Sequence, residues 1–337
     1  MRVAVDARSL RAPGTGRGIA VYLERLLAEL GRAHPEDSFE SVTGGRLWSA
    51  AGALLGRPRL DRAAGRCDVA WLPAPAPVAV SPSVPYVMTV HDLAFEHRRA
   101  DYRAYDRLWV RIARPHRLAQ RAARVIAVSE AVRREVVAEW RLDPARVVTV
   151  RSGPGRPGGP SGALPDGLAP GFILAVGALE PRKRPDLLAE AHALGRARGL
   201  RAELVFAGAG KPPAAGPRYL GRVDDATLEA LYASALVVAC PSREEGFGFT
   251  PLEAASRGTP AVVADLPPFR ETLGDAALAV PPGDPDALAE ALLRIERQPG
   301  LRERLSAAAR VAAGRLSWEC AARETRAVLA AAAEEAV

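Results

Sequence analysis

A chain of 337 residues with 48% hydrophobic and 25% charged residues is too long for one small core and too apolar to be disordered, so two globular domains are expected. Its net charge of +7 comes almost wholly from arginine, and the scarcity of aromatic side chains among the arginines argues against a nucleic-acid-binding protein. No apolar run reaches the roughly 18 residues of a membrane-spanning helix, and the start of the chain lacks a secretory signal pattern, so we expect a cytoplasmic protein.

The first half of the chain alternates short apolar runs with amphipathic stretches, a pattern typical of alternating strands and helices. Strands are expected at residues 3–5, 39–43, 69–72, 86–90, 125–128 and 147–150. Helical spacing of apolar residues occurs near 17–30, 101–122 and 130–140. Continuous Val, Ile and Leu strands separated by helices predict a parallel sheet covered on both faces.

A group of arginines gathers where the second of these helices is expected. Its members are Arg98, Arg99, Arg103, Arg107, Arg111, Arg114, Arg117, Arg121 and Arg124. Those from Arg99 to Arg121 recur every three or four residues, so one helix would align them in a stripe. The stripe is either a solvated helix face or a surface that attracts an anionic acceptor or acidic lipid head groups, which would hold the protein peripherally on the inner face of a membrane.

Residues 151–160 are dense in Gly and Pro and lack apolar periodicity, so they mark a boundary between two domains. After this boundary, strands are expected at 172–176, 204–207, 236–239, 261–264 and 278–280, and helices near 185–198, 225–234, 251–257, 284–297 and 300–313. The two halves together predict two doubly wound α/β domains in tandem. In such sheets ligands bind at the carboxyl ends of the strands, and the cleft between the domains is the expected site.

The segment from Pro241 to Phe249 follows an apolar strand and precedes a helix, so it is expected at a carboxyl end. Gly246 and Gly248 allow the backbone to turn sharply and a ligand to approach main-chain N–H groups closely. The start of the following helix offers a site for an anion. Because a carboxylate would repel a phosphate, Glu245 is expected to accept hydrogen bonds from neutral hydroxyls, such as those of a sugar.

Three acidic side chains stand where helices are expected to begin. Thr250-Pro251-Leu252-Glu253 is a complete capping box, which explains Glu253 without a ligand, although a cap does not exclude a ligand role. Asp284 precedes Pro285, and Asp224 precedes a helical pattern. Both are therefore expected to cap helices, which for Asp224 is preferred over binding a metal ion.

Further polar segments lie at other expected strand ends. Arg182 and Lys183 stand between a strand and a helix opened by proline, where they predict either a diphosphate clamp or a solvated basic turn. His91 ends a buried strand, where it is either structural or in contact with a substrate. The glycine-rich stretch 14–18 follows the first strand but lacks the dinucleotide-binding pattern. The three cysteines are far apart, without metal-ligand spacing, and are expected to be free thiols.

Together these segments resemble the retaining, GT-B-fold glycosyltransferases of family 4, also called group 1. The similar segments follow the family's order at residues 18–23, 90–93, 125–130, 176–183, 220–223, 241–280 and 316–319. The most specific match is the pair Glu245 and Glu253, with seven residues between them. The resemblance implies two doubly wound, Rossmann-like domains facing a central cleft. An acceptor-side domain would cover 1–155, a nucleotide-sugar-binding domain 156–315, and a helix over 316–337 would return to the first domain.

The resemblance implies four catalytic residues. Glu245 would contact hydroxyls of the transferred sugar, and His91 would contact the same sugar near its reacting carbon. Arg182 and Lys183 would bind the diphosphate and neutralise its charge as the leaving group departs.

Other residues are implied as contacts of the sugar-nucleotide donor. They are Gly16, Gly18, Val223, Gly246, Phe247, Gly248 and Glu253. Glu253 would hold the nucleotide ribose, and main-chain N–H groups around Phe247 would support the diphosphate. The loop that contains Gly16 and Gly18 would close on the donor or shape the acceptor site, and Val223 would lie near the nucleobase.

The implied reaction moves a hexose, with mannose as one candidate, from a nucleoside-diphosphate sugar to a hydroxyl group. GDP-mannose or a UDP-sugar would be the donor, and a glycan, a lipid-linked sugar or a small molecule the acceptor. The leaving diphosphate would take the acceptor's proton, so neither a cofactor nor a metal ion is implied. Alternative functions are a nucleotide-sugar epimerase, a phosphorylase of similar fold, or an inactive GT-B-fold binding protein.

Overall fold

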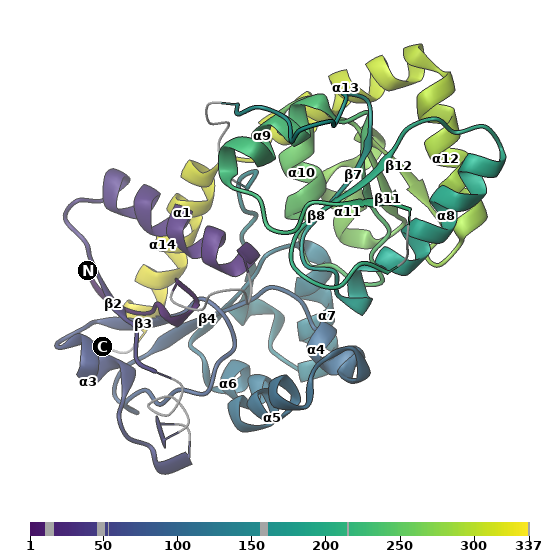
Figure 1. Ribbon diagram of the computed structural model, residues 1–337. Helices are drawn as coiled ribbons and strands as arrows, with labels where there is room; N and C mark the ends of the chain where they lie inside the picture. The colour runs from purple at the N-terminus through teal and green to yellow at the C-terminus, as the bar shows by residue number, and fades with distance from the viewer. Residues whose placement is uncertain (11–16, 46–50, 53, 156–160, 214–215, 336–337) are drawn as a thin grey trace. The chain divides into compact units, whose positions relative to one another are not determined.

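The computed structural model describes residues 1–10, 17–45, 51–52, 54–155, 161–213 and 216–335. The chain divides into two compact units. Unit 1 comprises Met1–Gly153 and Ser317–Val337, and unit 2 comprises Pro154–Leu316. Each unit is a parallel β-sheet covered by helices (Figure 1), so the α/β class predicted from the sequence is confirmed.

Among the described residues, the sheet of unit 1 has six parallel strands in the order β2-β1-β3-β4-β5-β6. They are β1 (Arg2–Asp6), β2 (Ser38–Val42), β3 (Val69–Leu72), β4 (Tyr86–Val90), β5 (Arg124–Ala127) and β6 (Val147–Thr149). Its helices include α1 (Arg17–Ala33), α3 (Leu60–Ala64), α4 (Ala94–His97), α5 (Ala104–Ala113), α6 (Pro115–Arg121), α7 (Glu130–Trp140) and α14 (Trp318–Glu334). The central strands are buried, which explains their continuous apolar sequence. The terminal helix α14 packs against α1 within this unit (Figure 1).

The single helix expected over 101–122 is wrong, because two helices, α5 and α6, take its place. Arg114 lies between them with a left-handed backbone (φ 47°), and Pro115 is the first residue of α6. Proline disfavours the helical conformation in the residue before it and has no N–H to donate, so α5 ends there. The arginines therefore do not form one straight stripe. Arg99 lies on a short 3-10 helix (Arg99–Asp101), Arg107 and Arg111 lie on α5, and Arg117 and Arg121 lie on α6, while others such as Arg103 lie outside these helices.

Within the described part of unit 2, six parallel strands form a sheet in the order β12-β11-β10-β7-β8-β9. They are β7 (Ile173–Val176), β8 (Leu204–Ala207), β9 (Arg218–Tyr219), β10 (Val237–Cys240), β11 (Ala261–Ala264) and β12 (Ala277–Val280). Its helices include α8 (Pro185–Ala197), α9 (Asp225–Ser234), α10 (Phe249–Ser256), α11 (Pro267–Thr272), α12 (Pro285–Arg297) and α13 (Pro299–Gly314). The sequence pattern does not predict β9, which is too short for an apolar run, or α11, whose two leading prolines resemble a loop.

A buried apolar cluster fixes the start of α8, which directly follows the basic segment at residues 182–184. Leu188 of α8, Phe206 of β8 and Leu292 of α12 all belong to this cluster, and α8 packs against α12 (Figure 1). Burying each such side chain stabilises the fold by about 1.5–3 kcal/mol. The basic segment is therefore attached to a rigid part of unit 2.

The two aspartates expected to cap helices do so. The Asp224 carboxylate accepts a hydrogen bond from the N–H of Thr227 at 2.7 Å, and Asp284 accepts one from the N–H of Ala287 at 2.9 Å. The expectation that Asp224 is a cap is therefore confirmed. The three cysteines are free, as predicted.

Candidate functional site

The basic segment and the glycine-containing loop of unit 2 meet at one edge of its sheet. The strands before them, β7 and β10, are hydrogen-bonded parallel neighbours, so their carboxyl ends lie side by side. A main-chain hydrogen bond joins the two following segments, from the N–H of Arg243 to the carbonyl oxygen of Arg182 at 2.8 Å. Residues that are about 60 positions apart in the sequence therefore share one site.

Glu245 and Lys183 form the centre of this site. The Lys183 ammonium donates to Oε1 of Glu245 in a close ion pair, and Ser242 Oγ donates to the same oxygen at 2.8 Å. Arg182 lies 3.6 Å from Oε2 of Glu245 and donates to the carbonyl oxygen of Glu244 at 2.9 Å. The structure thus brings together Glu245, Arg182 and Lys183, three of the four predicted catalytic residues.

The Glu245 carboxylate is ionised at physiological pH. Burial by itself would raise its pKa, but the positive charges of Lys183 and Arg182 and the hydrogen bonds from Lys183 and Ser242 outweigh burial and lower the pKa to about 2. An ionised carboxylate only accepts hydrogen bonds. Glu245 can therefore bind hydroxyl groups, while the adjacent cations can bind an anion.

The loop between Glu245 and α10 has a tightly constrained backbone. Gly248 has a left-handed conformation (φ 90°), and a Cβ there would lie 2.7 Å from the ring of Phe269. Gly246 and Phe247 are buried, and the Phe247 ring packs edge-on against Phe249, with centroids 5.2 Å apart. Only glycine satisfies both the backbone conformation and the space at position 248.

The capping box predicted at Thr250–Glu253 is wrong. The helix α10 begins at Phe249 with Gly248 as its N-cap, and no side chain caps it. The left-handed turn at Gly248 and the packing of Phe249 start the helix earlier than the box would. Glu253 therefore lies beyond the first turn, where its carboxylate cannot reach the N-cap N–H.

Glu253 is instead held by a tyrosine from another helix. Tyr232 of α9 donates its hydroxyl hydrogen to Oε2 of Glu253 at 2.7 Å. Burial and the adjacent Glu253 charge raise the pKa of Tyr232, so the phenol stays protonated and acts as a donor. The Arg257 guanidinium lies over the Tyr232 ring, 5.4 Å from its centroid, and donates to the main-chain oxygen of Glu253 at 2.8 Å. A Cβ at Gly155 would overlap Oε1 of Glu253, so the backbone of residue 155 also lies against this carboxylate.

Sequence reasoning missed Tyr232. Its position on α9 has the spacing of the buried residues Leu228 and Leu231, and the pattern indicates only a core residue. Only the fold brings its hydroxyl to Glu253.

Removing the Tyr232 hydroxyl tests whether it positions Glu253 for the nucleotide contact that the sequence resemblance implies. In Tyr232→Phe, we expect KM for the sugar nucleotide to rise about tenfold, because a hydrogen bond to a charged group is lost, while kcat changes little. Tyr86→Phe is the matched control, since Tyr86 donates to a carbonyl oxygen of unit 1 (Leu118, 2.7 Å). Steady-state kinetics would contradict the role if both variants changed KM equally, or if only kcat fell.

His91 belongs to unit 1, at the carboxyl end of β4. Its Nε2 lies 2.8 Å from the carbonyl oxygen of Pro73, and its ring packs edge-on against Tyr22 with centroids 4.8 Å apart. Burial lowers the pKa of His91, so the imidazole is neutral at pH 7. With Nε2–H donated to Pro73, Nδ1 is left as an acceptor for a hydroxyl hydrogen. Contact between His91 and a sugar-nucleotide donor stays a prediction.

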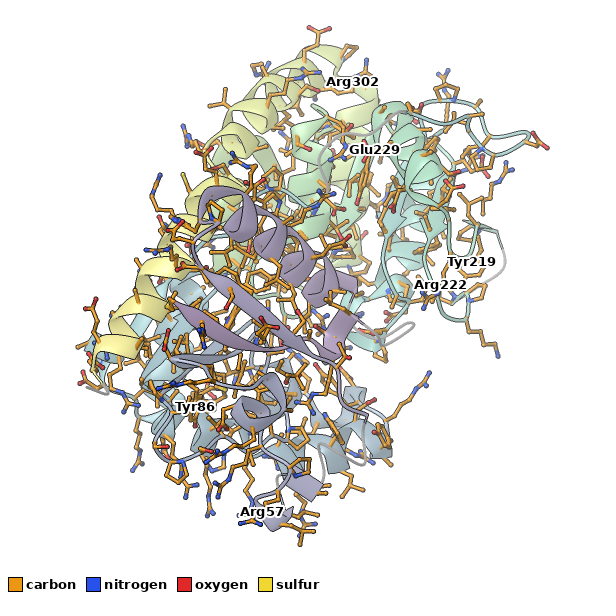
Figure 2. All side chains as sticks on the ribbon, turned by 90° about the vertical axis from the view of Figure 1, so that its left-hand side faces the viewer. Arg57, Tyr86, Tyr219, Arg222, Glu229 and Arg302 are labelled. Atoms are coloured by element: carbon orange, nitrogen blue, oxygen red, sulfur yellow. The ribbon has the colours of Figure 1, made fainter. Side chains whose placement is uncertain are left out.

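The remaining predicted residues are less informative. Gly16 lies outside the described residues, and Gly18 is exposed in the first turn of α1. Val223 is partly buried in the loop after β9, next to the exposed Arg222 (Figure 2). Tyr219 of β9 donates to the carbonyl oxygen of Gly208 at 2.8 Å, which ties this part of the chain to the end of β8. The nucleobase role of Val223 stays a prediction.

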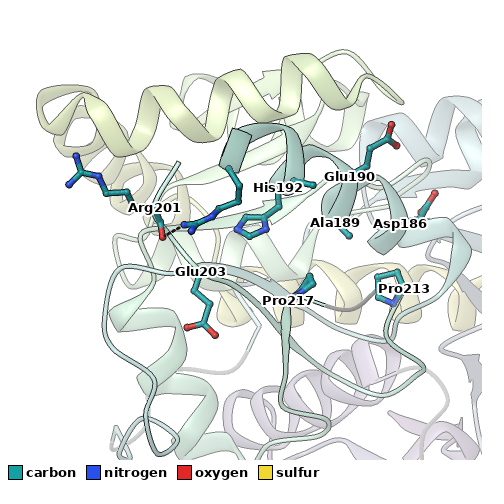
Figure 3. Close-up of a pocket in the computed structure, with 11 residues that line it drawn as sticks. Asp186, Ala189, Glu190, His192, Arg201, Glu203, Pro213 and Pro217 are labelled. Carbon is teal, nitrogen blue, oxygen red and sulfur yellow. Dashed lines mark hydrogen bonds between the residues drawn. The ribbon is translucent and has the colours of Figure 1, made fainter. Parts of the chain in front are cut away.

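A cavity of about 890 Å³ in unit 2 contains none of the predicted site residues (Figure 3). Asp186, Glu190 and His192 of α8 line it, together with Glu203 and Pro217. His192 lies 3.0 Å from the carbonyl oxygen of Ala202, a structural hydrogen bond. Charges of both signs surround the cavity without a common focus, so the cluster around Glu245 remains the candidate site.

Two further properties concern metal ions and membranes. Within the described ranges, no group of three or more His, Cys, Asp or Glu side chains is arranged to hold a metal ion. Across the same ranges, no helix is both long and apolar enough to cross a membrane.

The fold of two helix-covered parallel sheets is shared with solved structures, so the predicted GT-B fold class is confirmed. Anabaena Alr3699/HepE, solved in complex with UDP and glucose, has a TM-score of 0.69 at 16% identity, with 98% of this chain and 99% of that chain covered. WaaG, a glycosyltransferase involved in lipopolysaccharide biosynthesis, has a TM-score of 0.68 at 14% identity over 98% of this chain and 99% of that chain.

Sequence comparison identifies the family within this class. The family model "Glycosyl transferases group 1" matches residues 167–312, and "Glycosyltransferase Family 4" matches residues 28–153. The O-antigen chain mannosyltransferase B of Escherichia coli is 30% identical over 69% of this chain and 67% of its own length. A D-inositol 3-phosphate glycosyltransferase of Actinosynnema mirum is 34% identical over 74% of this chain and 66% of its own. The chain belongs to the group 1, family 4 glycosyltransferases, so the resemblance inferred from its motifs is confirmed, as is the expectation of a glycosyltransferase enzyme.

Proposed function

We propose that the protein is a retaining hexosyltransferase that uses a nucleoside-diphosphate sugar and a hydroxyl acceptor. The observation that carries this proposal is the cluster of Glu245, Lys183 and Arg182 at adjacent strand ends. It combines an ionised acceptor of hydroxyl hydrogen bonds with two cations that suit a diphosphate. Such a pairing matches a donor that joins a neutral sugar to a charged leaving group.

The proposed roles follow from this geometry. Glu245 orients the transferred sugar through its hydroxyls, while Arg182 and Lys183 bind the diphosphate. Main-chain N–H groups around Phe247, at the start of α10, add to the diphosphate site. Glu253, held by Tyr232, binds the ribose hydroxyls.

In the proposed reaction, the bond between the anomeric carbon and the diphosphate oxygen breaks, and the electron pair leaves with the diphosphate. The acceptor hydroxyl oxygen bonds to the same carbon on the same face of the sugar, and its proton passes to the leaving diphosphate. Arg182 and Lys183 stabilise the charge that develops on this group. His91, neutral and with Nδ1 as an acceptor, contacts a hydroxyl of the sugar.

We propose GDP-mannose or a UDP-sugar as the donor, and a glycan, a lipid-linked sugar or a small molecule as the acceptor. A mannosyltransferase among the relatives supports the first donor, and a structural neighbour solved with UDP-glucose supports the second. Thermal shifts measured with GDP, UDP, dTDP and ADP and with their sugars would identify the nucleotide. Stabilisation by one nucleotide and its sugar is expected, and the absence of any stabilisation would contradict the proposal.

We also propose peripheral contact with an anionic membrane through α5. Tyr105 and Leu108 of this helix are 46% and 54% exposed, and exposed arginines flank them. Replacing Arg103, Arg107 and Arg111 by glutamine is expected to weaken sedimentation with anionic vesicles, because each basic residue near such a surface contributes about 1 kcal/mol. Unchanged binding to vesicles would remove the proposed contact.

A further inference from the structure

A second cationic cluster lies in unit 1 and is not part of the proposed donor site. A cavity of about 530 Å³ lies between the segment after β4 and the helices α5 and α6. Five arginines line it: Arg99, Arg107, Arg111, Arg114 and Arg117. The one carboxylate in its lining is that of Glu96. The volume falls within the range of roughly 300–1,000 Å³ that is typical of small-ligand sites.

The five guanidinium groups have no carboxylate partner within the part of the chain that the structure describes. Elsewhere in the described residues some arginines have such partners, as Arg257 does with Glu229, whereas exposed ones such as Arg66 and Arg222 have none. The cavity differs from these places in that five arginines without a carboxylate partner line one hollow, together with a single carboxylate.

The arrangement concentrates positive charge in a way that does not favour folding. Arg107 and Arg111 are four residues apart on α5, where like charges destabilise a helix by about 0.2–0.5 kcal/mol. The left-handed backbone at Arg114 turns the chain, so that α6 brings Arg117 to the cavity that α5 already lines. A straight helix in place of α5 and α6 would not fold around a cavity in this way. The turn thus assembles a pocket rather than a flat stripe.

The chemistry of the lining selects the class of ligand. Arginine forks donate pairs of parallel hydrogen bonds that match phosphate oxygens, and they keep their charge at all physiological pH values. Five guanidinium groups around a small cavity offer more hydrogen-bond donors than one carboxylate ligand can accept. They suit a phosphate group, whose oxygens accept hydrogen bonds from several donors. Val110 and Pro115 add an apolar wall for the rest of the ligand.

We propose that this cavity is a binding site for the phosphate group of a phosphate ester, separate from the diphosphate site at Arg182 and Lys183. The ester is either a soluble molecule or the head group of a phospholipid, since both carry the same chemistry. The site binds one phosphate group per protein molecule, unlike the diffuse attraction of a charged surface to a membrane. Binding at this site does not require the transfer reaction.

Two double variants with the same net charge test the proposal. Arg114→Gln with Arg117→Gln removes two guanidinium groups from the cavity and none of those proposed for the membrane contact. The control, Arg66→Gln with Arg141→Gln, removes two exposed guanidinium groups of unit 1 that line no part of the cavity. All three proteins are first compared by thermal melting, and the pocket variant is expected to melt at or above the wild-type temperature because repulsion is relieved.

Binding is measured by calorimetry with inorganic phosphate at constant ionic strength, and by co-sedimentation with phosphatidylcholine vesicles with and without phosphatidic acid. The pocket variant is expected to lose about tenfold or more in affinity for phosphate, and the control to stay within about twofold. If the wild type sediments only with vesicles that contain phosphatidic acid, and only the pocket variant loses this sedimentation, the ligand is a lipid head group. If the wild type binds inorganic phosphate but does not sediment with these vesicles, the ligand is a soluble ester. Equal losses in both variants, or no loss in either, would overturn the proposal.

Discussion

Replacing Glu245 by glutamine is expected to lower kcat/KM for sugar transfer by about 10²–10³-fold. The glutamine side chain has nearly the same shape but lacks the charge that pairs with Lys183 and Arg182 and that we propose to orient the sugar hydroxyls. If Glu245 contacts the sugar and the cations hold the diphosphate, the variant should still bind the nucleoside diphosphate. The affinity for the free nucleoside diphosphate should therefore change by less than about threefold.

Glu290→Gln is the control for this variant, because Glu290 is exposed on α12 and the substitution removes the same charge. Its kinetics should match those of the wild type. A Glu245→Gln protein with full transfer activity would remove Glu245 from the mechanism. An equal loss of free diphosphate binding and of transfer would assign it a structural role in the basic segment instead.

Replacing Lys183 by methionine is expected to have the second largest effect. The variant lacks a cation of the proposed diphosphate site, and it leaves Glu245 with Arg182 as its remaining cationic neighbour. Transfer should fall about 10²-fold or more, with a matching loss of nucleoside diphosphate affinity. Lys211→Met, the other lysine of the chain, is the control, because Lys211 lies in the exposed segment after β8. Equal activity in both variants would contradict the assignment.

The same variant has a pH-dependent effect on stability. The folded pKa of Glu245 is lowered from 4.5 to about 2, so its ion pair stabilises the protein fully above pH 4.5 and is lost as the pH falls toward 2. The wild type should therefore exceed Lys183→Met in free energy of unfolding by about 1–3 kcal/mol at pH 7, and the difference should shrink as the pH falls below 4.5. Urea unfolding across this range measures it. A difference that is independent of pH would exclude the ion pair as its cause.

Most strands of both sheets were predictable from the sequence, because buried parallel strands are continuous apolar runs such as Val237–Cys240. The grouping of Glu245 with Lys183 was also predictable, since both follow strands of one sheet. The start of α10 was not, because the capping box and the left-handed turn at Gly248 compete for the same residues, and packing of Phe249 decides between them. Tyr232 was not predictable either, since contacts between separate helices leave no local pattern.

The arginine-rich segment at residues 98–124 is a second case in which the sequence pattern did not predict the local structure. Its helical spacing is present in the sequence, but Pro115 and the left-handed Arg114 divide it into α5 and α6. The spacing alone predicts a stripe, whereas the turn produces a cavity. A proline within a periodic pattern was the signal that could have predicted the break.

The most direct test of the account is release of nucleoside diphosphate from GDP-mannose and UDP-sugars by the purified protein. It is followed with a panel of sugars, inositol phosphates and lipid-linked sugars as acceptors, and the anomeric configuration of the product is read by NMR. The account predicts acceptor-dependent release from one donor, a product with the donor's configuration, and loss of both in Glu245→Gln. Release from no donor, an inverted product, or equal release by Glu245→Gln would contradict it.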